Sequence, residues 1–238
     1  FKVVESKRED IVVEKYAKSL TLESVAKWGA TVAIEKTDDA FMVELQNKVL
    51  KDFYTFLKTG TLKGTQKKWQ KALAIAKGAV LNKFAGMNRN VTEVVGFANV
   101  MDFYDWLGDK EITVQTMFGL QYIKDFFGFS TLFLLPDAYI PAKTVIATPV
   151  ENIDLYYIDP GDSDFKKLGL DYTTSGETNL IGFHAGGNYT NATGETYAIM
   201  GMKLWAEYLD GVCVVTVGTT DTIPEVSSTV SEASSNGK

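Results

Sequence analysis

The feature of the sequence that most limits the possible folds is a long apolar stripe in the first quarter of the chain. It recurs at spacings of three and four residues and consists of Met42, Leu45, Val49, Phe53 and Phe56. This spacing is the period of one face of an α-helix. Thr37 precedes the stripe as an expected N-cap, followed by Asp38 and Asp39 at the positive end of the helix dipole. We therefore predict a helix over residues 38–58, about 32 Å long at ~1.5 Å per residue, which can cross a whole domain as a spine.

The rest of the chain mixes helical and strand patterns, which predicts an α+β fold. Further helices are expected at 22–28, 66–84 and 99–107, and strands at 93–98, 144–148, 152–158 and 212–217. Residues 1–20 combine charged residues with β-formers, as in an exposed strand or hairpin arm. Residues 197–209 fit a helix and a strand equally well. After Val217 the sequence becomes Ser/Thr-rich, so we predict a flexible tail over 219–238.

Composition excludes several classes of protein. The chain of 238 residues is 45% hydrophobic and carries a net charge of −6, whereas a tight nucleic-acid binder normally shows a basic stripe. The lysines between Lys63 and Lys83 are expected on the solvent face of a helix. No apolar run reaches the length of a membrane-spanning helix. The single cysteine, Cys213, lies in an apolar run and is expected to be a buried structural thiol.

Residue types that usually carry chemistry are present without the partners that they need. His184 has no second His or Cys pattern beside it, so a structural or inter-subunit role is expected rather than a metal site. Asp159, Asp162 and Asp164 lack the glutamate that completes a calcium-binding loop, which favours a solvated turn. Residues 186–194 lack the lysine and the spacing of a phosphate-binding loop. We therefore predict no catalytic residue, no cofactor and no metal site, and no enzymatic function.

A series of short motifs follows a fixed order along the chain. It comprises Thr21–Gly29 with Glu35–Asp38, Glu93–Asn99 with Asp102 and Trp106–Gly108, Gln115–Leu120 with Phe126–Gly128, Asn152–Tyr156, Asn179–Phe183, and Tyr197–Gly211. In this order and spacing the motifs resemble the major capsid proteins of tailed double-stranded-DNA phages, particularly phages that infect Gram-positive bacteria. These proteins share the Hong Kong phage fold. The similarity covers most of residues 20–217.

The resemblance implies a division of the chain into the parts of that fold. Residues 1–20 would be the descending part of an extended loop that reaches over a neighbouring subunit, and 21–65 would form a peripheral domain around the spine helix. Residues 66–205 would form an axial domain of mixed sheet with flanking helices, and 206–218 would return to the peripheral domain. The family also has an N-terminal arm and the ascending half of the loop, so the chain is expected to be part of a longer protein.

The function that the resemblance implies is structural. Copies of the chain would assemble into the pentamers and hexamers of an icosahedral head that encloses double-stranded DNA without sequence-specific binding. Scaffold, portal and decoration proteins would be further partners, and no membrane would be involved. The protein would lie in the capsid of the virion after assembly in the host bacterial cytoplasm. The residues expected at inter-subunit contacts are Lys7, Arg8, Glu9, Asp10, Asp38, Asp39 and Asn188.

Two alternatives stay open at the level of sequence. An encapsulin-like compartment would have the same fold and load an enzyme cargo, and its gene would lie beside a cargo gene rather than beside portal and terminase genes. A small-ligand-binding α+β protein or enzyme would need a pocket with convergent polar groups. The sequence shows no nucleophile–base arrangement, metal cluster or phosphate loop in favour of this second alternative.

Overall fold

The chain forms two compact units, and neither of them is continuous in sequence. The computed structural model describes residues 10–108, 113–117, 120–174 and 179–226. Within these ranges, unit 1 combines residues 10–49 with 155–205, and unit 2 combines residues 50–154 with 206–226. The chain passes between the units inside a helix and inside two strands rather than inside loops.

These bounds differ from the division implied by the resemblance. Residues 155–205 were expected with 66–154, but they pack with the N-terminal segment because their strands pair with a strand that precedes residue 22. Residues 206–218 were expected beside the spine helix in a peripheral domain. Their strand lies instead inside the sheet of unit 2, between strands that begin at Leu62 and Thr144. Both differences arise from pairings between residues more than 60 positions apart, which no local pattern encodes.

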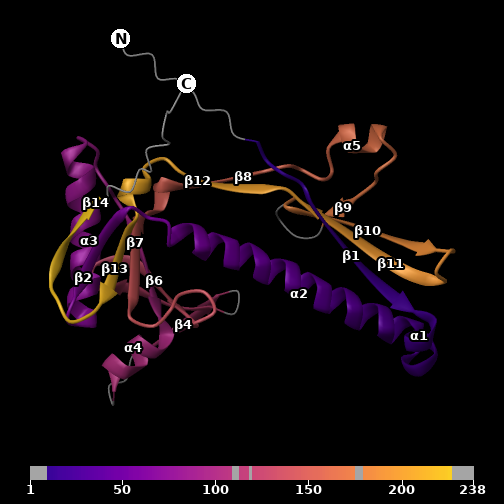
Figure 1. The fold of residues 1–238 in the computed structure, drawn as a ribbon, viewed down its shortest axis with the longest axis horizontal. Coiled ribbons are helices and arrows are strands. Elements are labelled where there is room, and N and C mark those ends of the chain that lie inside the picture. The colour runs from indigo at the N-terminus through magenta and orange to yellow at the C-terminus, as the bar shows by residue number, and fades with distance from the viewer. Residues whose placement is uncertain (1–9, 109–112, 118–119, 175–178, 227–238) are drawn as a thin grey trace, which may run out of the picture. The chain divides into compact units, whose positions relative to one another are not determined.

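Unit 1 is built on a four-stranded antiparallel sheet that lies along a helix (Figure 1). Its strands are β1 (Glu14–Thr21), β9 (Thr173–Thr174), β10 (Ile181–Asn188) and β11 (Thr193–Met200), in the order β1-β11-β10-β9. The short helix α1 (Leu22–Trp28) follows β1 and ends at Gly29, whose φ of 80° suits glycine. The long helix α2 (Ala30–Leu57) follows directly.

The predicted spine helix exists but begins eight residues earlier than expected. It starts at Ala30 rather than at Asp38 and ends within one residue of the predicted end. With 28 residues it is about 42 Å long. Thr37 is therefore not its N-cap, and Asp38 and Asp39 lie inside the helix, away from the positive end of its dipole. The missed turns carry exposed Val32 and Ile34 and so lack an apolar stripe.

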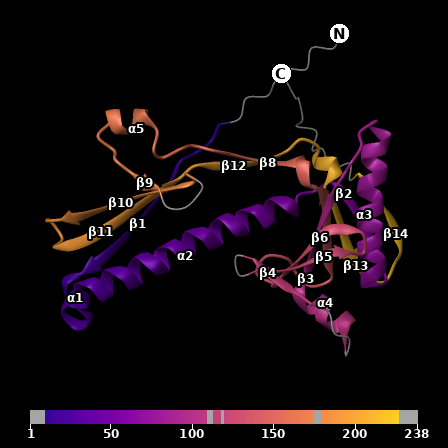
Figure 2. The ribbon, with the colours of Figure 1, turned by 180° about the vertical axis from the view of Figure 1, so that it is seen from behind.

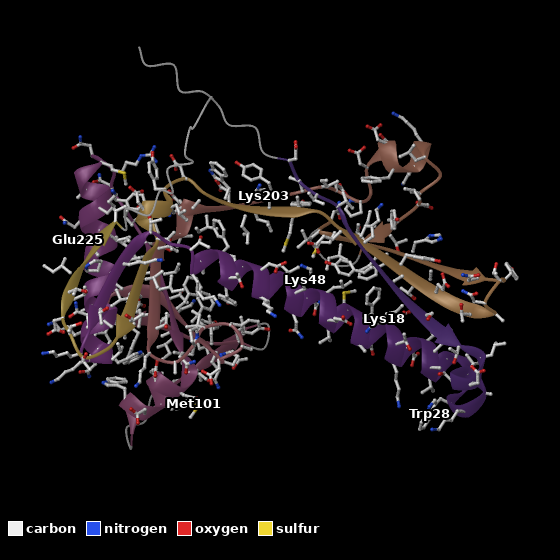
Figure 3. All side chains as sticks on the ribbon, viewed as in Figure 1. Lys18, Trp28, Lys48, Met101, Lys203 and Glu225 are labelled. Atoms are coloured by element: carbon white, nitrogen blue, oxygen red, sulfur yellow. The ribbon has the colours of Figure 1, made fainter. Side chains whose placement is uncertain are left out.

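Phe41 and Leu45 of α2 are buried and connect this helix to the sheet of unit 1. They form a core with Ile181, Ala198 and Met200 from the two central strands. Two ion pairs bind β1 to the same helix at the surface, Lys18 to Glu44 at 2.6 Å and Lys48 to Glu14 at 3.1 Å. Figure 3 shows Lys18 and Lys48 along this contact. The buried core, rather than the exposed pairs, contributes most of the stability here.

The remaining elements of unit 1 belong to its second sequence segment or lie where that segment meets unit 2. β8 (Ile153–Tyr157) and β12 (Met202–Ala206) form a two-stranded ribbon, so the strand predicted over 152–158 forms over 153–157. The predicted ambiguity at 197–209 resolves in favour of strands. The short helix α5 (Ser163–Lys167) lies between the ribbon and β9.

Unit 2 contains an eight-stranded mixed sheet in the order β14-β2-β13-β7-β3-β6-β5-β4. The strands are β2 (Leu62–Gln66), β3 (Val94–Asn99), β4 (Gln115–Met117), β5 (Leu120–Phe126), β6 (Phe129–Leu135), β7 (Thr144–Pro149), β13 (Cys213–Val217) and β14 (Thr222–Val226). Two of the neighbouring pairs, β2 with β13 and β3 with β6, are parallel. The predicted mixed sheet with flanking helices is therefore present.

Both faces of this sheet are covered within unit 2. The helices α3 (Trp69–Gly86) and α4 (Val100–Leu107) pack on one face, where Leu73, Phe103 and Val145 belong to the largest core. Figure 2 shows α3 along the strands at one side of the sheet. The other face carries Tyr54 and Leu57 from the last turns of α2. Central strands buried on both faces contain continuous apolar runs, as in β7. The single-turn 3₁₀ helices Val150–Asn152 and Leu209–Gly211 complete the unit.

The predicted flexible tail is wrong over its first part. β14 pairs with β2, and Gln66 donates a hydrogen bond from Nε2 to the carbonyl of Thr222 at 2.6 Å. Pro224 of β14 is buried over Gly64, where a Cβ atom would lie 2.8 Å from the proline ring. A glycine is therefore required in β2 for this approach. The remainder of the predicted tail, 227–238, lies outside the described residues.

Candidate assembly surfaces

The tip of the β10–β11 hairpin presents one aromatic side chain to solvent. Asn188 and Thr193 pair across the two strands and close a turn over residues 189–192. Tyr189 in this turn is 99% exposed. A tyrosine so placed contributes no packing to its own subunit, and tyrosine side chains are frequent anchors of protein interfaces.

Hydrogen bonds of Asn188 fix the conformation of this turn within the single subunit. Its Oδ1 accepts from the backbone N–H groups of Thr190, at 3.0 Å, and Asn191, at 3.4 Å. Its Nδ2 donates to Glu195 Oε1 at 2.8 Å. Asn188, a predicted contact residue, therefore acts on the turn itself and positions Tyr189. The sequence indicated a polar turn over 186–194, but no local signal identified Tyr189 as its exposed anchor.

A second exposed aromatic side chain lies at the junction of α1 and α2. Trp28 is 56% exposed, and the ammonium groups of Lys27 and Lys36 lie 5.0 and 5.2 Å from the centre of its ring. Leu22 and Val32 on the same two helices are also exposed. Figure 3 shows Trp28 at the outer end of these helices. An apolar surface with a basic margin suits a protein partner with acidic side chains.

Only some of the other predicted contact residues lie in the described part of the chain. Lys7, Arg8 and Glu9 lie outside the described residues, and Asp10 is exposed. Asp38 accepts a hydrogen bond from Thr196 Oγ1 at 2.9 Å and so joins α2 to β11. It also lies beside a mostly apolar groove of about 290 Å³ that includes Leu20, Ile34 and Gly194. Asp39 is exposed, so it is available to a neighbouring molecule.

Unit 2 has an open cleft of about 370 Å³ beyond the C-terminal end of α3. Its apolar lining comes from Phe84, Val91, Pro149 and Val150, and its acidic residues are Glu93, Glu151 and Glu207. Arg89 pairs with Glu207 at 2.8 Å and stacks on the ring of Tyr208. Asn152 at the base is buried and bonded to the backbone of Tyr208 in both directions, at 2.9 Å. The cleft is thus a fixed, net acidic feature.

The opposite end of α3 is basic. Lys67 and Lys68 are exposed, the N-cap position is Lys68, and the first turn holds no acidic residue. Asp221, just before β14, accepts from the backbone N–H of Lys67 and from the ammonium of Lys71, each at 2.9 Å. These bonds hold the pKa of Asp221 below its ordinary value, the Lys71 bond most of all. A carboxylate from a distant part of the chain therefore replaces the missing helix cap.

His184 and the aspartates of residues 159–164 make contacts with neighbouring parts of the chain. His184 Nδ1 lies 2.9 Å from the carbonyl oxygen of Asp171. Asp159 accepts from Gly161 N–H and from Asn179, Asp162 caps α5 through Asp164 N–H, and Asp164 pairs with Lys167. Over the described ranges no cluster of three or more His, Cys, Asp or Glu side chains could hold a metal ion. Cys213 is buried, as predicted.

No helix in the described part of the chain is both long enough and apolar enough to cross a membrane.

Comparisons by sequence and by structure give different results. No family model matches the chain, and no curated protein matches it by sequence. A virus-like particle protein from Pyrococcus furiosus matches the fold with a TM-score of 0.54 and 14% identity, covering 90% of this chain and 79% of that one.

Two further solved structures match to the same extent. A protein of Mycobacterium phage Che8 has a TM-score of 0.55 and 9% identity, with 86% of this chain and 70% of that one covered. An encapsulin complex from Synechococcus elongatus has a TM-score of 0.55 and 10% identity, with 90% and 76% covered. Identities this low compare folds and not activities. The chain therefore has the Hong Kong phage capsid fold, as the resemblance implied.

Proposed function

We propose that the chain is the major capsid protein of a tailed phage, whose copies form the pentamers and hexamers of an icosahedral head around double-stranded DNA. The observation that carries the proposal is the fold, which matches a virus-like particle protein and a phage protein over most of this chain. Scaffold, portal and decoration proteins are further partners in this proposal. Such a protein lies in the virion capsid after assembly in the host cytoplasm.

Within this proposal, unit 1 is the peripheral domain and unit 2 the axial domain. Unit 1 holds most of the long helix and the β10–β11 hairpin, which are elements suited to contacts between neighbouring rings. Unit 2 holds the wide sheet with its two flanking helices. Residues 10–20, which include most of β1, belong to the predicted extended loop in this proposal. In this proposal Asp38, Asp39 and Asn188 contribute to contacts made by unit 1, and Asn188 acts through the turn that carries Tyr189.

The first experiment is negative-stain electron microscopy with size measurement on the full-length parent protein. Closed shells or six-fold rings support the proposal. A stable monomer at high concentration contradicts the proposal and favours the alternative of a small-ligand-binding protein or enzyme.

The hairpin tip gives a residue-specific test of the same proposal. Replacing Tyr189→Ser removes the ring but leaves the Asn188 hydrogen bonds, whose partners are the backbone N–H groups of Thr190 and Asn191 and the Glu195 carboxylate. Because truncation of an interface anchor costs at least ~2 kcal/mol, shell yield should fall by about tenfold or more. The control Thr190→Ser keeps the turn and should assemble normally. Equal yields from both variants would remove Tyr189 from the interface.

The N-terminal arm is tested by charge reversal. Lys7→Glu combined with Arg8→Glu should prevent normal assembly of the full-length protein if these residues contact a neighbour, because opposite charges across the contact would become like charges. Unchanged assembly excludes the arm contact.

An encapsulin-type shell is the second candidate, since the likeness to an encapsulin complex equals the likeness to the phage protein. Purified particles distinguish the two. Particles filled with DNA, encoded beside portal and terminase genes, indicate a phage head. Particles that co-purify with one enzyme encoded next to the shell gene indicate an encapsulin.

A further inference from the structure

The charges of unit 2 are unevenly distributed along the sequence. Residues 53–92 contain eight lysines and arginines and no aspartate or glutamate, although the chain as a whole has a net charge of −6. Three cations of this segment pair with the C-terminal stretch, namely Lys71 with Asp221, Lys83 with Asp210 and Arg89 with Glu207. The remaining cations therefore determine the surface charge of the segment.

Two of these cations gather at the start of α3. Lys67 and Lys68 are exposed, and in the described part of the chain neither side chain makes an ion pair. Both stand at the positive end of the helix dipole, where a cation is unfavourable. Asp221 offsets this by binding the backbone N–H of Lys67 and the side chain of Lys71. Both lysine side chains remain exposed to solvent.

The cleft beyond the other end of α3 has the complementary character. Glu93 and Glu151 are exposed, and each is without an ion-pair partner among the described residues. The apolar walls of the cleft come from Phe84, Val91 and Val150. A lysine side chain joins an aliphatic stem to a terminal cation, so it fits a cleft with apolar walls and carboxylates.

The patch and the cleft cannot meet within one copy. They stand at opposite ends of α3, a rigid helix of 18 residues that is about 27 Å long. A direct contact between the lysines and the cleft therefore requires two copies in a head-to-tail arrangement. A repeated head-to-tail contact closes into a ring when its rotation allows.

We propose that Lys67 and Lys68 of one copy enter the Glu93–Glu151 cleft of the next copy and so join unit 2 of adjacent subunits within a ring. This inference rests on the proposed shell function and names one contact that the shell would use. The partner is a second copy of this chain, selected by charge complementarity. A nucleic acid on the lysines is the competing outcome, because phosphates would also accept their charge.

Two charge-reversed variants of the full-length protein test the contact. Variant A carries Lys67→Glu and Lys68→Glu, and variant B carries Glu93→Lys and Glu151→Lys. Each alone would bring like charges together, so the concentration needed for ring or shell formation should rise at least about tenfold. An equimolar mixture restores both contacts if A and B alternate, which predicts even-numbered rings by native mass spectrometry.

Controls separate this contact from folding, from net charge and from the proposed function. Circular dichroism and thermal unfolding should show that A and B are folded. Lys166→Glu with Lys167→Glu changes the net charge as much as variant A does but lies on α5, and it should assemble normally.

Each pattern of results decides between the contact and the wider function. Shells from the wild type and equally from A and B overturn the contact and leave the proposed function intact. Loss in A and B without rescue on mixing also overturns it. If A forms shells but no longer binds DNA fragments that the wild type binds, the lysines serve the nucleic acid instead. A wild type that never assembles removes both proposals.

Discussion

At the scale of single residues, Cys213 shows how burial controls chemistry. It lies on β13 in the largest core, and desolvation raises the pKa of its thiol from 9.0 to about 12. The thiolate is the reactive form, so the native thiol should react slowly at neutral pH. Labelling with a thiol reagent should be at least about a hundredfold faster after unfolding in denaturant, and equal rates would show that β13 opens readily.

The same thiol predicts a loss of stability in alkali. The unfolded chain releases this proton near pH 9, whereas the folded chain keeps it until about pH 12. The unfolded state therefore binds fewer protons over this range, and the free energy of unfolding falls as the pH rises. Urea unfolding at pH 8 and pH 10.5 should show a smaller fall in the free energy of unfolding for Cys213→Ala than for the wild type, because the variant lacks the thiol. Tyrosine ionisation affects both proteins alike and cancels in the comparison.

Phe103 is a fully buried residue of unit 2 whose truncation should cost several kcal/mol. It lies on α4, and its ring contacts those of Trp69, Trp106 and Phe126. Phe103→Ala leaves a cavity that neighbouring rings cannot fill, and it should lower the free energy of unfolding by about 3–5 kcal/mol. Met101 on the same helix is 63% exposed and is labelled in Figure 3. Met101→Ala, the matched control, should cost under ~0.5 kcal/mol.

At the scale of elements, β14 depends on a space that only glycine leaves. A Cβ atom on Gly64 would lie 2.8 Å from Pro224, so Gly64→Val should displace β14 from β2. Hydrogen exchange should then speed up at Thr65, whose N–H donates to Thr222 Oγ1 at 2.8 Å, and at Lys67, whose N–H donates to Asp221. Exchange in β10 and β11 of unit 1 serves as the internal control. Unchanged protection at Thr65 would show that β14 tolerates the larger side chain.

Sequence patterns predicted where helices and strands form better than they predicted which of them pack or pair together. Local patterns predicted α1, α3, α4 and β3 to within a few residues. The signals were the apolar spacing of α3, the glycines that end α1 and α4, and the apolar run of β3. Local patterns missed the start of α2, where exposed Val32 and Ile34 break the stripe, and β14, whose composition is that of a linker. The cleft beyond α3 could not be predicted from the sequence, because Glu93, Glu151 and Glu207 meet only through tertiary packing.

At the scale of the whole molecule, salt should weaken assembly if Lys67 and Lys68 contact Glu93 and Glu151 of the next copy. Raising NaCl from about 0.1 M to about 1 M shortens the screening length from ~10 Å to ~3 Å. Light scattering of the wild type should then show a higher threshold concentration for assembly. An A and B mixture should depend on salt in the same way, while stronger assembly at high salt would indicate a mainly apolar contact.

The late position of β13 in the sequence has a consequence for how the protein is made. This strand lies between β2 and β7 in the interior of the sheet, yet among the described strands only β14 follows it in the sequence. The sheet of unit 1 likewise remains incomplete until β11 has been synthesised and can pair with β1. A chain that ends before β11 therefore lacks an interior strand in each of the two sheets. Neither sheet can be completed while its first strands emerge, so both units fold late in synthesis.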